Sequence, residues 1–151
     1  MRITACDDQS LDSWIRLRRE LWPDTALSDH ALEAEDMLKD PGQAIAFLAR
    51  NTDGTALAFA EAALRHDYVN GCTTSPVAFL EGIYVSPEYR KQGIARLLCG
   101  AVEEWARSLG CTELASDVEL HNSRSQSMHL AIGFEETERV VYYRKSLQPQ
   151  G

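Results

Sequence analysis

The sequence predicts a mixed α/β fold, and three observations support that class. Apolar runs of strand length occur, of which residues 77–85 are the clearest. Other segments repeat their apolar residues at helical spacing, above all residues 94–109. Strand and helix signals alternate in the second half of the chain, as they do in strand–helix–strand crossovers. The 151 residues contain no internal repeat or linker-like stretch, so we expect one domain spanning residues 1–151.

The chain opens with signals for one strand and two helices. Residues 2–6 have the pattern of a first strand, and Ser10 is a suitable N-cap for a helix that runs to about Trp22. Pro23 ends this helix, because proline disfavours helical geometry at the residue before it. A second helix is expected over residues 28–38, where an Asp-Pro-Gly turn follows.

Three strands are expected next. Residues 44–50 and 56–65 read as a hairpin, because residues 51–54 have the Asn-Thr-Asp-Gly composition of a hairpin turn. Residues 66–75 form a polar loop, and residues 77–85 form the apolar strand that follows it.

The last part of the chain alternates helices and strands. Residues 94–109 carry one apolar stripe at helical spacing, and Gly110 is the expected C-cap. A short strand over residues 113–117, a helix over residues 123–132 and a final strand over residues 138–144 complete the chain. The expected order is therefore strand, two helices, three strands, helix, strand, helix, strand.

The charge balance narrows the class of partner. Fifteen basic and 23 acidic residues give a net charge of −8, which argues against nucleic acid as the principal partner. A negative field favours a cationic substrate, although ordinary solubility accounts for the same charge.

The cysteines and the N-terminus indicate a cytoplasmic protein without a metal site. The four cysteines, at positions 6, 72, 99 and 111, form no Cys-x-x-Cys pair, and reduced thiols are the plainest interpretation. The first ten residues lack the apolar core of a signal peptide, and no run approaches membrane-spanning length.

The segment between the strand 77–85 and the helix 94–109 has the composition of an anion-binding loop. Main-chain N–H groups at a helix N-terminus are unpaired, and the helix dipole adds positive potential there. Arg90 and Lys91 add charge, and Gly93 lets the backbone approach a ligand closely. A phosphate or pyrophosphate suits this site, whereas the alternative is a solvated charged turn before a helix.

Residues 79–95 resemble the acetyl-CoA motif of the GCN5-related N-acetyltransferase (GNAT) superfamily. Its signature, [Gln/Arg]-x-x-Gly-x-[Gly/Ala] after a strand and opening a helix, is present at residues 90–95. Residues 131–134, Ala-Ile-Gly-Phe, are similar to the family's closing helix-to-strand element, and the match covers residues 43–145. The resemblance implies acetyl-CoA as co-substrate. It also implies a central, mostly antiparallel sheet with a splayed pair of strands at the acetyl-CoA site.

Longer strings resemble one group within that superfamily, the aminoglycoside 6′-N-acetyltransferases. The strings occupy residues 21–23, 65–72, 79–83, 115–117 and 133–140. The resemblance implies acetyl transfer from acetyl-CoA to the 6′-amine of an aminoglycoside, which gives antibiotic resistance, and it implies a homodimer built through the C-terminal strand. Two alternatives stay open: another amine substrate, such as a polyamine, amino sugar or protein N-terminus, and a non-catalytic acyl-CoA-binding module.

The resemblance also implies which residues hold the cofactor. Backbone groups of the strand pair with the pantetheine amides, and loop amides hold the pyrophosphate. Asn122 matches an asparagine that reaches the cofactor, but an N-cap for the following helix explains it equally well. The full implied set is Ile83, Tyr84, Val85, Arg90, Lys91, Gln92, Gly93, Ile94, Ala95, Arg96 and Asn122.

Two carboxylates and one main-chain amide are the candidates for catalysis. Glu81 lies in an apolar strand, where a charge is costly unless it is paired or faces a cleft, although a solvated strand face is the alternative. Asp117 ends the next strand, and an aspartate at such a position more often forms the following turn than binds a ligand. A carboxylate raises the pKa of a nearby amine and so opposes its deprotonation. We therefore expect both to position the amine, with Asp117 preferred as proton acceptor, and the N–H of Val85 to stabilise the oxyanion, as in the family.

Three further residues match the aminoglycoside pocket of the family. They are Trp22, Tyr68 and Glu138. Core packing is the alternative for Trp22, and pairing with a nearby arginine is the alternative for Glu138, whereas Tyr68 in a polar loop is the better functional candidate on its own merits. One position departs from the superfamily pattern, because His129 stands where many members carry a tyrosine acid. The proton donor to the leaving thiolate is therefore unassigned, with His129 and Tyr143 as candidates.

Overall fold

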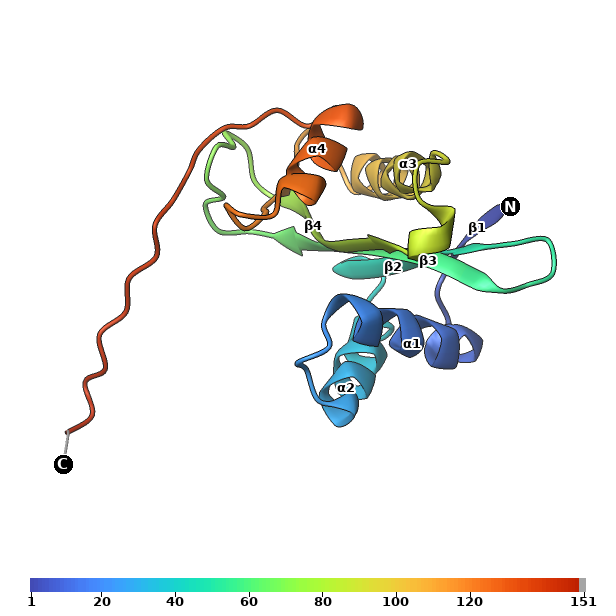
Figure 1. Ribbon diagram of the computed structural model, residues 1–151. Helices are drawn as coiled ribbons and strands as arrows, with labels where there is room; N and C mark the ends of the chain where they lie inside the picture. The colour runs from blue at the N-terminus through green and yellow to red at the C-terminus, as the bar shows by residue number, and fades with distance from the viewer. Residues whose placement is uncertain (150–151) are drawn as a thin grey trace.

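The computed structural model of the chain describes residues 1–149 and contains one five-stranded sheet between two layers of helices (Figure 1). The strand order is β1-β2-β3-β4-β5, and neighbours are antiparallel except for the parallel pair β4–β5. The strands are β1 (Arg2–Ala5), β2 (Ala44–Arg50), β3 (Ala56–Arg65), β4 (Val77–Val85) and β5 (Leu114–Ser116). The helices are α1 (Leu11–Leu21), α2 (Leu27–Met37), α3 (Ile94–Ser108) and α4 (Ser123–Ala131), with short 3-10 turns η1 (Asp8–Ser10) and η2 (Pro87–Tyr89).

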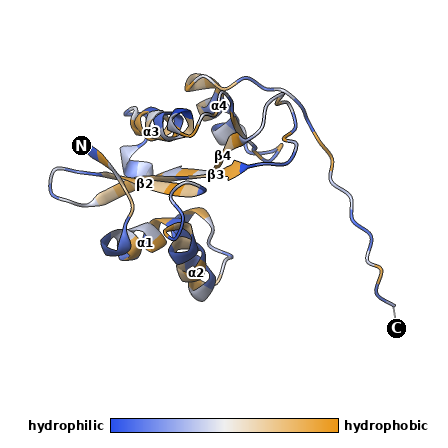
Figure 2. Cartoon of the chain, turned by 180° about the vertical axis from the view of Figure 1, so that it is seen from behind, coloured by the Kyte–Doolittle hydropathy of each residue, from blue (hydrophilic) through white to orange (hydrophobic). Residues whose placement is uncertain are grey.

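Each face of the sheet has its own hydrophobic core. The apolar stripe of α3 packs on one face, where Leu98 and Val102 are fully buried against β3 and β4. Helices α1 and α2 cover the other face, where Trp14 and Phe59 belong to a second buried cluster. Figure 2 shows hydrophobic residues along the central strands, whereas the helices mix polar and hydrophobic residues as amphipathic helices do.

Most of the predicted elements are present in the structure. The predicted bounds of β2, β3 and β4 agree with those observed, and the helices differ from prediction by one or two residues at their ends. The start of α1 differs from the prediction, because the side chain of Ser10 makes no capping hydrogen bond to this helix. Asp7 instead accepts hydrogen bonds from the N–H groups of Gln9 and Ser10 and caps the preceding turn η1.

Strand β4 has two irregularities in its middle. Glu61 of β3 pairs with Gly82, and its neighbour Ala62 pairs with Leu80, so Glu81 is the extra residue of a β-bulge. On the other side, the pairing of β4 with β5 ends at Leu80 and Ser116. Strand β4 continues to Val85 without β5 beside it, so the two strands form a fork that opens at Glu81.

The prediction of a final strand over residues 138–144 is wrong for this structure. Residues 134–149 form no strand or helix, and the segment leaves the body of the protein as an extended tail (Figure 1). Its side chains Val141, Tyr142 and Tyr143 are 72%, 82% and 92% exposed. A strand is stabilised by hydrogen bonds and packing against a neighbour, and this segment pairs with no strand among the described residues 1–149.

Candidate active site

The loop before α3 presents free main-chain donors, as its composition predicts. Gly93 is the N-cap of α3 in the left-handed conformation, with φ +83°, and Lys91 also has a positive φ of 64°. Within residues 1–149, no protein acceptor pairs with the main-chain N–H groups of residues 91–96. Alternation of left-handed and ordinary conformations turns successive N–H groups to one side, which suits an anion. No protein atom lies within 4 Å of a Cβ built on Gly93, so its φ explains the glycine.

Two arginine side chains at this loop donate hydrogen bonds to main-chain oxygens at the ends of neighbouring elements. The Nε of Arg90 donates to the main-chain oxygen of Val85 at 2.8 Å, and its guanidinium lies 5.5 Å from the ring centroid of Tyr84. Arg96 donates to the main-chain oxygen of Ala131 and so ties the start of α3 to the end of α4. Arg90 therefore contributes a positive charge to the loop and also holds the end of β4 next to it.

Asn122 has the capping role that was left open as an alternative. Its side-chain oxygen accepts a hydrogen bond from the N–H of Ser125 at 3.1 Å and caps α4. The cap accounts for this asparagine within the chain, and a role toward a cofactor stays a prediction.

The unpaired edge of β4 lies between this loop and the fork. Ile83, Tyr84 and Val85 are half-buried and lie beyond the last residue that pairs with β5. A strand edge with free N–H and C=O groups can pair with an extended ligand that carries amides. Residues 83–85 and the loop 90–96 are joined by the turn η2 and by the hydrogen bond from Arg90 to Val85, and their role toward a cofactor stays a prediction.

Glu81 is both paired and accessible. Its carboxylate binds Arg65 with Nη2 to Oε2 at 3.0 Å, and the side chain is 35% exposed. The guanidinium of Arg65 lies 3.4 Å from the ring centroid of Phe79, which fixes its position on the strand. The bulge therefore turns Glu81 out of the apolar run, and a cation that approaches it competes with Arg65.

Trp22 lies directly against Gly82, the residue after Glu81. A Cβ on Gly82 would come within 2.6 Å of two indole atoms, so only glycine leaves room for this ring. The Arg18 guanidinium lies 4.9 Å from the indole centroid, and Phe59 contacts the ring edge-on at 5.9 Å. Two residues predicted for the substrate pocket, Trp22 and Glu81, are thus brought together from α1 and β4.

A cavity of about 340 Å³ opens beside these two residues. Three carboxylates and one guanidinium line it, so its lining has a negative formal balance. A larger hollow of about 650 Å³ lies over α3 and β1 and includes only Arg96 among the predicted site residues. The smaller cavity is therefore the better candidate for a cationic ligand. Its lining is Arg18, Trp22, Thr25, Glu33, Met37, Glu61 and Glu81.

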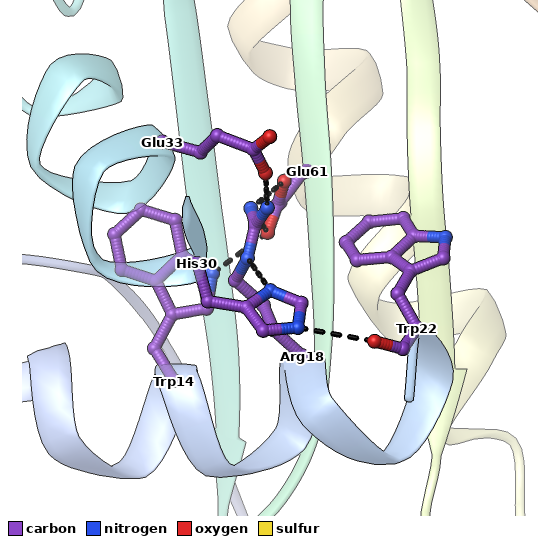
Figure 3. A network of polar contacts seen from close by, with 6 residues as sticks. All are labelled: Trp14, Arg18, Trp22, His30, Glu33 and Glu61. Carbon is purple, nitrogen blue, oxygen red and sulfur yellow. Dashed lines mark hydrogen bonds and ion pairs between the residues drawn. The ribbon is translucent and has the colours of Figure 1, made fainter. Parts of the chain in front are cut away.

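A buried polar network, shown in Figure 3, contributes residues to the lining of this cavity. Nη1 of Arg18 donates to both carboxylate oxygens of Glu61, at 2.7 and 2.6 Å. Trp14 Nε1 donates to the same carboxylate at 2.8 Å, and Glu33 accepts from Nη2 of Arg18 at the cavity surface. Arg18 and Glu61 are 3% and 4% exposed. A buried ion pair is tolerated when its remaining donors and acceptors are satisfied, which is the case here.

His30 joins this network to Trp22. Nε of Arg18 donates to Nδ1 of His30 at 3.2 Å, so this ring nitrogen is an acceptor and the proton lies on Nε2. Nε2 then donates to the main-chain oxygen of Trp22 at 3.1 Å. The network thus fixes both the ring and the main chain of Trp22.

The electrostatics of Glu61 follow from its burial. Desolvation raises the pKa of Glu61 above its ordinary value, and the neighbouring Arg18 and Trp14 oppose that rise by stabilising the carboxylate. Sequence reasoning missed this residue. The available signal was a single acid in the apolar strand 56–65, together with an arginine on the apolar side of the first helix.

Three predicted substrate residues are not gathered at this cavity. Tyr68 is 75% exposed in the loop after β3, and Asp117 is exposed directly after β5. Glu138 is exposed in the tail, whose start lies near the same loop because Thr137 is in contact range of Gly71. Arg139 pairs with Glu136 rather than with Glu138. Among residues 1–149, no group of three or more histidine, cysteine or acidic side chains is arranged to hold a metal ion.

Comparisons with known proteins show which family the chain resembles. The chain is 54% identical over 145 residues to the aminoglycoside N(6′)-acetyltransferase type 1 of Serratia marcescens, covering 96% of this chain and 99% of that protein. It is 47% identical to the protein of that name from Acinetobacter baumannii, covering 97% of this chain and 99% of the relative.

Solved structures match as well. The ligand-free aminoglycoside antibiotic 6′-N-acetyltransferase AAC(6′)-IG of Acinetobacter haemolyticus superposes with a TM-score of 0.91 at 43% identity, covering 98% of this chain and all of that one. AAC(6′)-Iy, in complex with the bisubstrate analogue CoA-S-monomethyl-acetylneamine, superposes with a TM-score of 0.92 at 46% identity. The match covers 96% of this chain and 97% of that one. The acetyltransferase (GNAT) family matches residues 10–134 of the chain. With its forked strands, free loop amides and full-length relatives, this chain belongs to the GNAT family of acetyltransferases.

Proposed function

We propose that this protein transfers the acetyl group of acetyl-CoA to the 6′-amine of aminoglycoside antibiotics and thereby confers resistance. The observation that carries the proposal is the position of the acidic cavity. It lies beside Trp22 and Glu81, at the fork where β4 separates from β5. An aromatic face and a carboxylate suit an aminated sugar ring, and the loop amides of residues 91–96 suit a pyrophosphate. The relatives that share the full length carry the same activity in their names.

The cofactor is held mainly by main-chain groups in this proposal. Residues 83–85 pair with the amides of the pantetheine arm, and residues 90–96 hold the pyrophosphate, with Asn122 near the cofactor as well. Acetyl-CoA supplies the activated thioester. The protein supplies a fixed strand edge and a helix N-terminus, so little reorganisation is needed on binding.

The reaction needs a neutral amine, an oxyanion donor and a departing thiolate. The substrate ammonium first loses a proton, for which Asp117 at the end of β5 is the acceptor. The amine nitrogen then attacks the thioester carbon, and the N–H of Val85 stabilises the negative oxygen. The nitrogen of the adduct loses a further proton as the C–S bond breaks, and the sulfur takes up one proton, which leaves the amide and the free CoA thiol. Glu81 orients the amine, with Trp22, Tyr68 and Glu138 against the rest of the sugar.

A thiol-release assay tests the activity. Purified protein with acetyl-CoA should release CoA thiol with an aminoglycoside that carries a 6′-amine, and mass spectrometry should find one added acetyl group on the antibiotic. A matched aminoglycoside with a 6′-hydroxyl in place of the amine is the control and should give no release. Equal release with both compounds would overturn the 6′ assignment, and release with simple polyamines alone would favour another native amine.

We infer further that the protein is a homodimer built through its C-terminal segment. The tail is extended, and its apolar and aromatic side chains Val141, Tyr142, Tyr143 and Leu147 are largely exposed. Strand β5 is an edge strand, so the side away from β4 is open to a further strand. In a dimer, the tail of a second copy covers the open edge of β5 and buries its own exposed side chains. Removal of residues 138–151 should convert a dimer to a monomer in analytical ultracentrifugation, and a monomeric full-length protein would contradict the inference.

We also infer that the 151 residues act as one cytoplasmic domain. One sheet carries the five strands described, and the four cysteines are free. Burial raises the pKa of the Cys99 thiol to about 12, which keeps it in the unreactive form. Separately, none of the helices within residues 1–149 is long and apolar enough to cross a membrane.

A further inference from the structure

A serine and a buried histidine meet where β4 and β5 separate. Ser116 is the last residue of β5 and pairs with Leu80, the final pair before the fork. Its Oγ lies 2.8 Å from Nε2 of His129, which α4 supplies and which is 9% exposed. The proposed chemistry so far uses neither residue.

The contacts of His129 define which nitrogen carries the proton. Nδ1 lies 2.8 Å from the main-chain oxygen of Ser125, and a carbonyl oxygen can only accept, so Nδ1 donates. In the neutral ring Nε2 is then an acceptor, and the hydroxyl of Ser116 donates to it. Phe134 packs against the ring with centroids 5.0 Å apart and holds its plane. The arrangement is a hydroxyl, a base and a group that orients the base.

The hydroxyl of Ser116 has a second hydrogen-bond partner, so it can change from donor to acceptor toward His129. Oγ also lies 3.3 Å from the main-chain oxygen of Leu80. When Nε2 of His129 holds a proton, Oγ accepts from it and is free to donate elsewhere. A hydroxyl between a base and a reacting atom can therefore pass a proton both ways.

The position of Ser116 matches the reacting atoms of the proposed reaction. Asp117 follows it directly, and Glu81 follows its pairing partner on β4. The free edge of β4 that receives the pantetheine arm begins at this point. The thioester at the end of that arm therefore comes to the mouth of the fork.

Resting on the proposed function, we propose that Ser116 and His129 form a proton relay for acetyl transfer. Addition of the amine to the thioester gives a tetrahedral adduct with a positively charged nitrogen. Oγ of Ser116 takes a proton from that nitrogen while its own proton moves to Nε2 of His129. When the C–S bond breaks, the imidazolium returns the proton through Oγ to the sulfur. A C–N and an S–H bond are formed, an N–H and the C–S bond are broken, and both side chains return to their starting state.

The two residues have different roles in this relay. Ser116 is the catalytic residue, because its hydroxyl touches the reacting nitrogen and sulfur. His129 acts through Ser116 and is a positioning residue that also stores the proton. The other proton, lost when the substrate ammonium becomes an amine, leaves through Asp117 to solvent.

Four single variants test the relay in the full-length protein. Ser116→Ala should lower kcat by about 100-fold, the usual size of a lost acid–base group, while both KM values stay within about twofold. His129→Gln keeps a polar contact but not the proton transfer, and should also lower kcat strongly. Ser116→Thr retains a hydroxyl and should restore most of kcat. Ser127→Ala is the matched control, because this exposed serine of α4 makes no side-chain hydrogen bond within residues 1–149.

A double variant and an isotope effect separate the relay from a structural tie between α4 and β5. If the two residues act as a unit, Ser116→Ala combined with His129→Gln should have about the kcat of Ser116→Ala alone. The solvent deuterium isotope effect on kcat should fall in both single variants. Thermal unfolding and affinity for CoA report on the fold in every variant and should be close to those of the wild type.

The outcomes are distinct. A wild-type protein that releases thiol with a 6′-amine, together with a Ser116→Ala kcat within twofold of it, overturns the relay and leaves the proposed function standing. A Ser116→Ala defect confined to the KM for acetyl-CoA also overturns the relay, because it indicates a binding role. A wild-type protein that releases no thiol with any amine overturns both.

Discussion

The two sides of the forked strand are built in different ways. The cofactor side consists of main-chain groups from one stretch, residues 83–96, with Gly93 and Lys91 in left-handed conformations. The cavity side consists of side chains from α1, α2, β3 and β4, held by a buried ion pair. Main-chain geometry follows from a short motif, whereas side chains from four elements meet only when the whole sheet is in register. In the proposed function the first side therefore serves the cofactor common to the family, and the second side selects the amine.

The largest expected effect comes from opening the buried network of the cavity side. Arg18→Met leaves the Glu61 carboxylate buried without its charge partner, which should cost about 3–5 kcal/mol in the free energy of unfolding. Urea denaturation measures this loss. The matched variant Arg18→Met with Glu61→Leu removes both charges and should recover a large part of it. A single variant as stable as the wild type would show that the network does not support the cavity.

The next effect concerns chemistry rather than stability. Asp117→Asn should lower kcat by about 100-fold and raise the KM for the aminoglycoside much less, because an amide accepts no proton. Glu81→Gln is the comparison, since it should act mainly on the KM for the aminoglycoside. An unchanged kcat in Asp117→Asn would refute its role as proton acceptor.

Two glycine variants compare the two sides directly. Gly82→Ala puts a Cβ within 2.6 Å of the Trp22 ring and should raise the KM for the aminoglycoside by about tenfold, equivalent to about 1.4 kcal/mol. Gly93→Ala forces a side chain into φ +83° at the N-cap of α3, which costs about 1–2 kcal/mol, and should raise the KM for acetyl-CoA instead. Steady-state kinetics with each substrate varied in turn measures both. If either variant raised both KM values alike, the cofactor side and the cavity side would not bind their substrates independently.

The effect that is smallest at neutral pH is a pH dependence of stability that appears only in alkaline solution. Cys99 on α3 is 2% exposed, and burial raises the pKa of its thiol from 9.0 to about 12. Below pH 9.0 the thiol is neutral in both states, so its contribution is fully present. Above that value the unfolded thiol ionises and the folded one does not, so stability falls by about 1.4 kcal/mol per pH unit until the folded pKa is reached. Denaturation between these limits measures the slope, and Cys99→Ala should reduce it.

The parts that could be predicted from sequence are those with local causes. The strands 44–50, 56–65 and 77–85 were predicted with their observed bounds, because apolar runs and a turn composition mark both ends. The cap of α4 by Asn122 was also among the predicted alternatives. The prediction of a final strand over residues 138–144 was wrong, because its composition suits a strand but it pairs with no strand among residues 1–149.

The buried network could not be predicted from local patterns. Arg18, His30 and Glu61 lie on three different elements, and nothing in the sequence near one of them specifies the other two. The bulge at Glu81 was hidden for a similar reason, because it exists only as a mismatch of register between β3 and β4. His129 was a candidate acid by position alone, and its contact with Ser116 emerged only from the packing of α4 on the fork.

The sequence by itself determined most of the elements, the loop with unpaired main-chain amides before α3, and the family. These depend on spacing along the chain and on the unpaired amides of a helix start, which act within a few residues. The tertiary structure decided where β4 and β5 part, which carboxylates face the cavity and which serine meets His129. Those contacts join residues tens of positions apart, and they depend on strand register and on how helices pack on the sheet.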